Sequence, residues 1–400
     1  MRLTIFDIYN IRNSLKHFTT YIIVFSFIML TSCAKNISTD VAMEQSSETL
    51  FKLMKEGIDN SYNQIPGIIL SIKSPKLSED WDGVYGYDST KKIDSLSIDQ
   101  PFRIASITKT FVATSILRLH EDGLLDIYDP ISKYISKDHI SILLKDDYGP
   151  DNIQIYHCLN HTSGLFDYAM NGSDYGSIAK KTPQRRWTRT EQLQLAMDFG
   201  EPAGKPGDKY LYSDTGYILL GEIIESFYDG DLAKGIRDLI GFDTLGMNHT
   251  WLESLEPEPA NMKSPVKRYF GRDDATDFDP SVDLFGGGGL VSTCGDLTIF
   301  LQALYNDKIF KKSSTLKLMQ TKHVFTSDYA QEDDPRFKDY RLGMWKVSVY
   351  GDDAYMHSGL WGTTFIHIPD QNSSFAVNFT KGWSNRMLKK SILLVNNLEE

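Results

Sequence analysis

The chain has 400 residues, of which 41% are hydrophobic, so it is long enough to bury a large core in one domain or two lobes. Its formal net charge of −11 and isoelectric point of about 5.3 disfavour nucleic acid and anionic lipid surfaces as partners. The sequence shows neither internal repeats nor low-complexity tracts.

The N-terminus has the pattern of an export signal. Arg2, Arg12 and Lys16 precede an apolar run over residues 21–30, which is too short to span a bilayer comfortably and is typical of a signal-peptide core. We therefore predict that residues 1–32 are a signal peptide and that the protein works in the cell envelope.

The apolar run ends in Leu30-Thr31-Ser32-Cys33, which resembles the bacterial lipobox. This resemblance implies that Cys33 is lipidated and becomes the new N-terminus, so that acyl chains anchor the protein to a membrane. The alternative is a plain secretory signal with a chance cysteine. The polar residues 33–45 are predicted to be a tether that precedes one domain over residues 46–400.

The two other cysteines, Cys158 and Cys294, are too few for a disulfide framework. They could pair in an oxidising envelope, but two buried free thiols are the favoured interpretation.

Strand patterns are found at both ends of the chain. An amphipathic helix from Glu48 precedes predicted strands at 68–72 and 81–87, and further strands are predicted at 340–350, 355–359, 363–368 and 374–380, before a terminal helix over 385–397. Alternation of Phe375, Val377 and Phe379 is typical of such strands.

The middle of the chain, at about 125–265, is predicted to be a mainly helical lobe with a polar surface loop at 171–190 and a helix that ends at Gly164. We therefore expect an α+β fold, in which an antiparallel sheet from both chain ends is flanked by helices and a helical lobe is inserted. The site would lie between the sheet and the lobe.

Ser106 is the best candidate for a nucleophile. The pattern Ser-x-x-Lys occurs six times, beginning at Ser32, Ser89, Ser106, Ser177, Ser264 and Ser314. Only Ser106 opens a long helix with an apolar face, predicted over 106–122, and Lys109 lies on the same face one turn later. A neutral lysine amine can take the proton of a serine hydroxyl, and burial at the foot of a helix favours the neutral amine.

Three motifs occur in the order that is typical of the serine β-lactamase and penicillin-binding-protein superfamily. Ser106-Ile107-Thr108-Lys109 matches its Ser-x-x-Lys element, Tyr212-Ser213-Asp214 resembles Tyr-Ser/Ala-Asn, and His357-Ser358-Gly359 resembles Lys/His-Thr/Ser-Gly. The segments at 122–126, 161–165 and 288–292 also fit, so the resemblance covers about 48–380.

The resemblance implies a role for each motif. Ser106 would attack an acyl carbon, with either Lys109 or Tyr212 as the base, and the positive charges of Lys109 and His357 would lower the pKa of Tyr212. The backbone N–H groups of Ser106 and Leu360 would bind the oxyanion.

The third motif would line the substrate. His357 and Ser358 are predicted to bind it, and Gly359 would let it approach the strand, because glycine has no side chain.

The departure from the family pattern is Asp214, which stands where the family usually has Asn. An ionised Asp cannot donate a hydrogen bond to a substrate carbonyl, and its charge would favour the ammonium form of Lys109. We therefore expect weak or absent β-lactamase activity and a preference for other esters or peptides, for example with a cationic amine near Asp214.

The function predicted from the sequence is a serine hydrolase acting through an acyl-enzyme on an amide or ester, as a DD-carboxypeptidase-like peptidase or an esterase. The alternatives are a β-lactamase and a non-catalytic lipoprotein that binds peptidoglycan or a protein. No cofactor is implied, and the spacing of His, Cys and carboxylates does not indicate a catalytic metal.

Overall fold

The computed structural model describes residues 47–61, 65–169, 174–322, 339–382 and 384–398. The predicted signal peptide and Cys33 lie outside these residues. The chain divides into two units, Met1–Lys52 and Leu53–Glu400, and residues 47–59 are helical. The labelled strands and helices all belong to the second unit. Within the described residues, none of the helices has the length and apolar character needed to cross a membrane.

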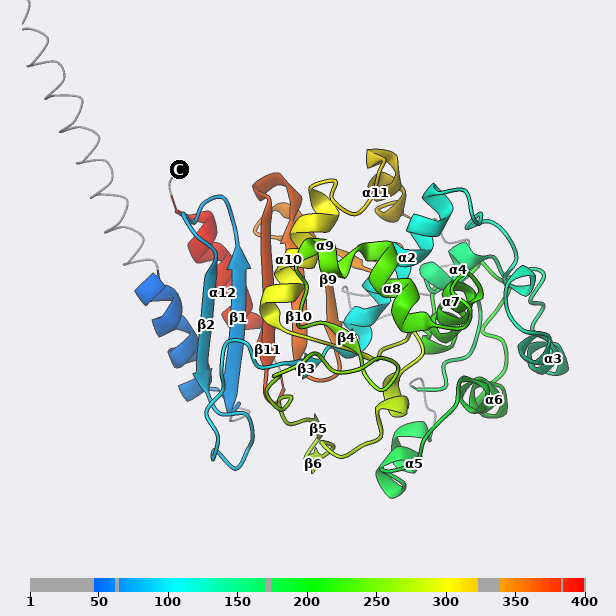
Figure 1. The fold of residues 1–400 in the computed structure, drawn as a ribbon, viewed down its shortest axis with the longest axis horizontal. Coiled ribbons are helices and arrows are strands. Elements are labelled where there is room, and N and C mark those ends of the chain that lie inside the picture. Colours follow the sequence, from blue (N-terminus) through cyan, green and yellow to red (C-terminus); the bar gives the residue numbers. More distant parts are fainter. Residues whose placement is uncertain (1–46, 62–64, 170–173, 323–338, 383, 399–400) are drawn as a thin grey trace, which may run out of the picture. The chain divides into compact units, whose positions relative to one another are not determined.

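A six-stranded antiparallel sheet is built from both ends of the chain, as the sequence predicts (Figure 1). Its strand order is β2-β1-β11-β10-β9-β8. The strands are β1 (Gly67–Lys73), β2 (Trp81–Gly86), β8 (Trp345–Val349), β9 (Asp352–Gly359), β10 (Thr363–Ile368) and β11 (Ser373–Phe379). The first and last strands of the chain meet in the register Ile68 opposite Phe379, so the sheet needs both ends of the unit.

The central strands are buried on both faces. Every residue of β10 and β11 is buried, and helix α10 (Cys294–Tyr305) packs on β1, β10 and β11. The hydroxyls of Ser71 on β1 and Thr298 on α10 lie 3.1 Å apart and hydrogen-bond across this contact. Because all residues of β10 and β11 are buried, these strands have no solvated face, and α10 covers one of the two faces.

The segment between β1–β2 and β8 contains most of the helices. A small three-stranded sheet, β3-β7-β4, lies within it, together with a two-stranded ribbon of β5 and β6. Besides α10, the labelled helices of this segment are α2 (Thr108–Glu121), α3 (Lys137–Lys145), α4 (Ile155–Leu159), α5 (Tyr175–Lys181), α6 (Arg189–Phe199), α7 (Asp214–Ser226), α8 (Leu232–Ile240), α9 (Phe242–Leu245) and α11 (Ser313–Met319), and α12 (Asn385–Asn396) follows the last strand. The short strands are β3 (Phe102–Arg103), β4 (Trp251–Leu252), β5 (Tyr269–Phe270), β6 (Asp273–Asp274) and β7 (Leu290–Ser292).

Helix α2 is the centre of the core. All but one of its residues are buried, and it packs against α7, α8 and α11. Phe111 stacks on Phe300 of α10 with ring centroids 3.9 Å apart and meets Phe242 edge-on at 5.9 Å. A helix enclosed in this way holds the residues of its first turn in a fixed position.

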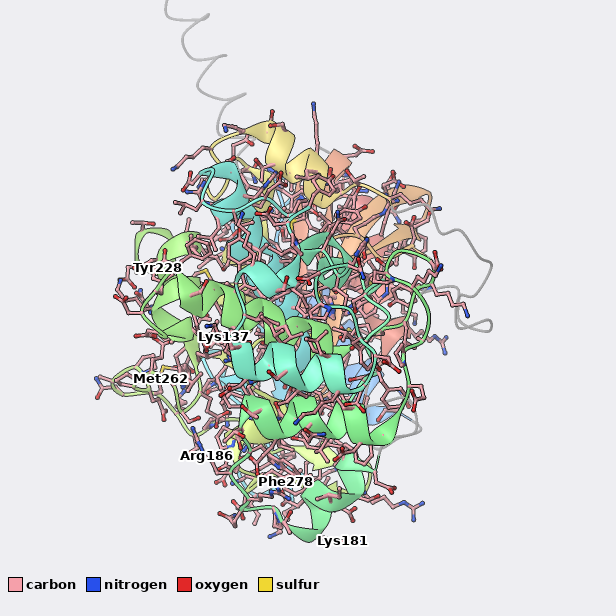
Figure 2. All side chains as sticks on the ribbon, turned by 90° about the vertical axis from the view of Figure 1, so that its right-hand side faces the viewer. Lys137, Lys181, Arg186, Tyr228, Met262 and Phe278 are labelled. Atoms are coloured by element: carbon pink, nitrogen blue, oxygen red, sulfur yellow. The ribbon has the colours of Figure 1, made fainter. Side chains whose placement is uncertain are left out.

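Two predictions about the helical region are wrong. The helix predicted to end at Gly164 is α4, which ends earlier, at Leu159. The chain then turns through His161 and Gly164, whose φ angles of 59° and 75° are left-handed. The segment predicted as a polar loop contains α5, since Tyr175 and Ala179 give it a buried face that the surrounding polar residues obscured. Figure 2 views the molecule from this helical side, where Lys137 of α3 and Lys181 of α5 are labelled.

Candidate active site

Ser106 lies in a tight turn between β3 and α2. It belongs to a 3₁₀ turn, Ala105–Ile107, and is partly exposed although both its neighbours are buried. Ala105 has a φ of 45°, which is an unfavourable backbone conformation for a residue with a side chain. Strain of this kind is found at functional sites that the surrounding fold holds in place.

Lys109 follows one turn later and is fully buried. Its Nζ donates to Ser106 Oγ at 3.0 Å and to the Gly287 carbonyl at 2.6 Å, and it forms an ion pair with Asp214. The structure therefore brings the first two residues of the predicted catalytic set into direct contact. The Asp214 carboxylate lies in ion-pair contact with the Lys109 amine.

Tyr212 reaches the same hydroxyl from the turn before α7. It stands two residues ahead of that helix and hydrogen-bonds to Ser106, and Lys109 Nζ lies 5.0 Å from the centre of its ring. Burial raises the pKa of Tyr212 well above its usual value, and the charge of Asp214 raises it further. The expectation of a lowered pKa for Tyr212 is wrong, because desolvation and the charge of Asp214 raise this pKa.

His357 is not a second cation. Burial, and then the charge of Lys109, lower the pKa of His357 to about 3, so its ring is neutral at pH 7. The ring is completely buried on β9, where Nε2 pairs with the Tyr340 hydroxyl at 3.2 Å and Nδ1 lies 2.9 Å from the Ser358 carbonyl. Because the side chain is enclosed, it supports the strand and does not present a charge to a substrate.

Gly359 has a structural role in addition to the one predicted for it. A Cβ at this position would lie 2.0 Å from the Ile104 carbonyl oxygen and 3.2 Å from the Ala105 side chain. The absent side chain therefore lets β9 approach the turn that holds Ser106. The β9–β10 ladder ends at Gly359, so the N–H of the exposed Leu360, the predicted oxyanion donor, lies just beyond the paired strands.

Two carboxylates of this region were missed by sequence reasoning. Asp167 Oδ1 accepts the backbone N–H groups of Asp214 and Ala169, each at 3.1 Å, and its side chain is fully buried. Burial and then the charge of Asp214 raise the pKa of Asp167. Burial and the same charge raise the pKa of Asp283 to about 6. Both residues lie in segments without a recognisable spacing, so only the fold brings them near Asp214.

His161 supports the Tyr212 turn. Its Nδ1 accepts the backbone N–H of Ser213 at 3.1 Å, and its ring centroid lies 4.2 Å from that of Tyr212 and 4.5 Å from that of Tyr340. Burial lowers the pKa of His161 well below its usual value, so the neutral ring can accept this hydrogen bond at neutral pH. These contacts hold Tyr212 in place beside Ser106.

The remaining polar candidates do not form a metal centre. Within the described residues, His, Cys, Asp and Glu side chains do not gather in groups of three or more that could hold an ion. Cys158 and Cys294 are both buried free thiols, as the sequence favoured.

A comparison with protein families shows to which family the chain belongs. A family model described as Beta-lactamase matches residues 74–395. The chain belongs to this family. The predicted family is therefore confirmed.

Two curated relatives come from Bacillus subtilis (strain 168). Penicillin-binding protein 4* is 26% identical over 283 residues, which cover 67% of this chain and 57% of that protein. An N-acetylmuramyl-L-alanine amidase is 28% identical over 314 residues, which cover 69% of this chain and 67% of that protein. The match thus spans 57% to 67% of these relatives' own lengths.

Among solved structures, the D-amino acid amidase from Ochrobactrum anthropi SV3 complexed with D-phenylalanine has a TM-score of 0.71 and 22% identity, over 89% of this chain and 100% of that one. This similarity confirms the predicted fold class.

Proposed function

We propose that the chain forms an acyl-enzyme at Ser106 and that its substrates are amides or esters without a carboxylate next to the scissile bond. The contact of Ser106 with both Lys109 and Tyr212 carries the first part of this proposal. The serine oxygen would attack the acyl carbon, and the backbone N–H groups of Ser106 and Leu360 would stabilise the oxyanion.

The charges of the motif residues support the second part. His357 is neutral and buried, and the positive charge of Lys109 is compensated by Asp214. Neither motif side chain therefore offers a positive charge to the terminal carboxylate of a D-alanyl-D-alanine peptide or to the carboxylate of a β-lactam. This favours amidase or esterase activity over carboxypeptidase and β-lactamase activity.

A side-by-side assay of the purified protein tests the proposal. D-amino acid amides, short-chain p-nitrophenyl esters, D-alanyl-D-alanine peptides and nitrocefin are compared for the wild type and Ser106→Ala. We expect turnover of at least one neutral amide or ester, with kcat/KM about 100-fold higher than for any substrate with an adjacent carboxylate. The Ser106→Ala variant should be inactive.

Mass spectrometry after treatment with a fluorophosphonate gives the second readout. Mass addition on Ser106 is expected in the wild type only. Efficient nitrocefin hydrolysis would contradict the proposed substrate class. A folded wild type that no acylating probe labels would instead support the non-catalytic binding protein.

We also propose that the protein is exported and held at the membrane by lipid on Cys33. The lipobox-like sequence before Cys33 supports this, and so do the names of the relatives, which refer to penicillin binding and muramyl-alanine bonds, both part of cell-wall chemistry.

A further inference from the structure

Each of the three N–H donors of a protonated Lys109 has an acceptor within reach. A protonated lysine has three N–H donors, and Lys109 Nζ has three neighbours that can accept them: Ser106 Oγ at 3.0 Å, the Gly287 carbonyl at 2.6 Å, and the Asp214 carboxylate in an ion pair. This geometry fits the charged form of Lys109. An ammonium group cannot take the proton of Ser106, so the resting arrangement is not yet competent for attack.

Tyr212 in its resting form cannot take the proton of Ser106 either. Burial and the charge of Asp214 raise its pKa, so it is a neutral phenol. One of the Lys109 protons must therefore move before the amine can act as the base. Of its three acceptors, a hydroxyl and a peptide carbonyl are very weak bases, whereas the carboxylate of Asp214 can accept a proton and hold it.

We infer that Asp214 is the proton acceptor that frees Lys109 to act as the base, an inference that rests on the proposed acyl-enzyme function. A proton passes from Nζ to Asp214 Oδ1, which leaves a neutral amine and a neutral carboxylic acid. As the bond from Ser106 Oγ to the acyl carbon forms, the hydroxyl proton passes to Nζ. The leaving group departs with a proton from Nζ, and the acid then returns its proton to the amine. At the end of acylation the original ion pair is restored and Ser106 carries the acyl group.

The burial of both groups makes this transfer accessible. Lys109 is fully buried and Asp214 is 8% exposed, so converting the pair to two neutral groups relieves the desolvation of both charges. Gly287 allows the close approach, because a Cβ there would lie 3.1 Å from Asp214 Oδ1. An Asn in the family's usual pattern could not accept this proton.

The titratable groups around Lys109 and Asp214 influence which of the two holds the shared proton. Asp167 retains a proton because its pKa is raised, so it holds the Asp214 backbone without adding a charge that would oppose the transfer. Asp283, with a pKa of about 6, is anionic at neutral pH and favours a proton on the pair, and His357 is neutral. Among the described residues, the titratable groups that interact electrostatically with Lys109 or Asp214 are Asp167, Tyr168, Tyr175, Tyr212, Tyr217, Asp283, His161 and His357.

The test measures the rate of acylation against pH in Asp214→Asn, which keeps the shape of the side chain and removes the acceptor. The burst of p-nitrophenol from p-nitrophenyl acetate is followed from about pH 6 to about pH 9, per active site titrated with a fluorophosphonate. Asp296→Asn is the matched control, since Asp296 is a buried carboxylate of α10 that accepts from the Thr250 hydroxyl and the backbone N–H of His249.

The wild type and Asp296→Asn should acylate at a nearly constant rate across this range, because the transfer within the pair exchanges no proton with solvent. Asp214→Asn should be slower by about 100-fold at neutral pH, and its rate should rise about tenfold per pH unit, because Lys109 must then lose its proton to water. Unchanged rates in Asp214→Asn would overturn the inference, as would a uniform loss without a pH slope. A wild type that is not acylated at Ser106 would overturn the proposed function as well.

Discussion

At the scale of single residues, charges in the site are set by burial more than by sequence neighbours. Lys109 and His357 occupy the positions that the motifs predict, but one is neutralised by a carboxylate and the other is an uncharged ring. Desolvation shifts the pKa of a buried group in the direction that favours its neutral form. An opposite charge or a hydrogen bond to the charged form opposes that shift. The motifs thus identify the residues, and the packing decides their protonation.

Asp167→Asn should remove a pH dependence of stability. The folded state raises the pKa of Asp167 above its unfolded value, so the native protein binds this proton more tightly. As pH rises from about 4 towards the raised folded pKa, the unfolded chain releases the proton first, and the free energy of unfolding falls. Relative to the wild type, the variant should therefore gain stability as pH rises through this window.

Urea denaturation at a series of pH values measures this difference. Parallel pH profiles for the wild type and Asp167→Asn would show that the Asp167 carboxyl is not the group that holds the proton. The variant should keep its esterase activity at neutral pH, since an Asn can still accept the N–H of Asp214.

His357→Gln should change stability more than substrate affinity. The His357 ring is buried, neutral and bonded to Tyr340, so its loss removes packing and one hydrogen bond, which cost about 1–3 kcal/mol of unfolding free energy. The KM for a neutral ester should stay within about threefold of the wild-type value.

His367→Gln is the control for this prediction, because His367 is a second buried neutral histidine in the same sheet, on β10. A KM that rises more than about tenfold in His357→Gln alone would mean that this ring binds the substrate directly.

At the scale of elements, the site depends on how closely strand β9 approaches the turn at Ser106. The sequence identifies a glycine in the third motif, but the Ile104 carbonyl that lies against it comes from a segment far away in the chain. Such a contact cannot be predicted from local spacing. It explains why β9, which ends next to the predicted oxyanion donor, can lie so close to the turn that holds the nucleophile.

Gly359→Ala should therefore disturb both stability and catalysis. Its Cβ would meet the Ile104 carbonyl oxygen at 2.0 Å, and backbone atoms cannot move away cheaply. We expect a loss of about 1–3 kcal/mol in the free energy of unfolding and a fall in kcat of at least about tenfold. Thermal melting and ester turnover measure the two effects.

Gly295→Ala provides the comparison. Gly295 lies in α10, where a Cβ would approach only the Thr293 hydroxyl, at 3.9 Å. This substitution should leave turnover unchanged and alter stability by less than about 1 kcal/mol. Equal behaviour of the two variants would show that the β9 contact does not position the oxyanion donor.

At the scale of the whole molecule, the described unit has one sheet assembled from both of its ends, and the helical segments lie between them in the sequence. The pairing of β1 with β11 joins residues about 300 positions apart. The fold class could nevertheless be predicted, because hydrophobic alternation marked strands at both ends and helical periodicity marked the middle.

The proposed membrane anchor also concerns the whole protein. Cys33→Ser should move the protein from the membrane fraction to the soluble fraction of the cell envelope, because acyl chains contribute about 0.8 kcal/mol per buried methylene. The control is Cys294→Ser, which alters a buried free thiol and should stay with the membrane. Fractionation, with mass spectrometry of the N-terminal peptide, measures the outcome. An unmodified N-terminal peptide in the wild type would contradict the lipoprotein proposal.

The sequence by itself determined the fold class, the family and the identities of Ser106, Lys109 and Tyr212, because each lies in a short motif whose order along the chain is informative. It also identified Asp214 as the departure from the family pattern. Only the tertiary structure decided that Asp214 neutralises Lys109, that Asp167 lies behind it, and that His357 is uncharged. These properties depend on burial and on contacts between segments distant in the chain, which no local pattern encodes.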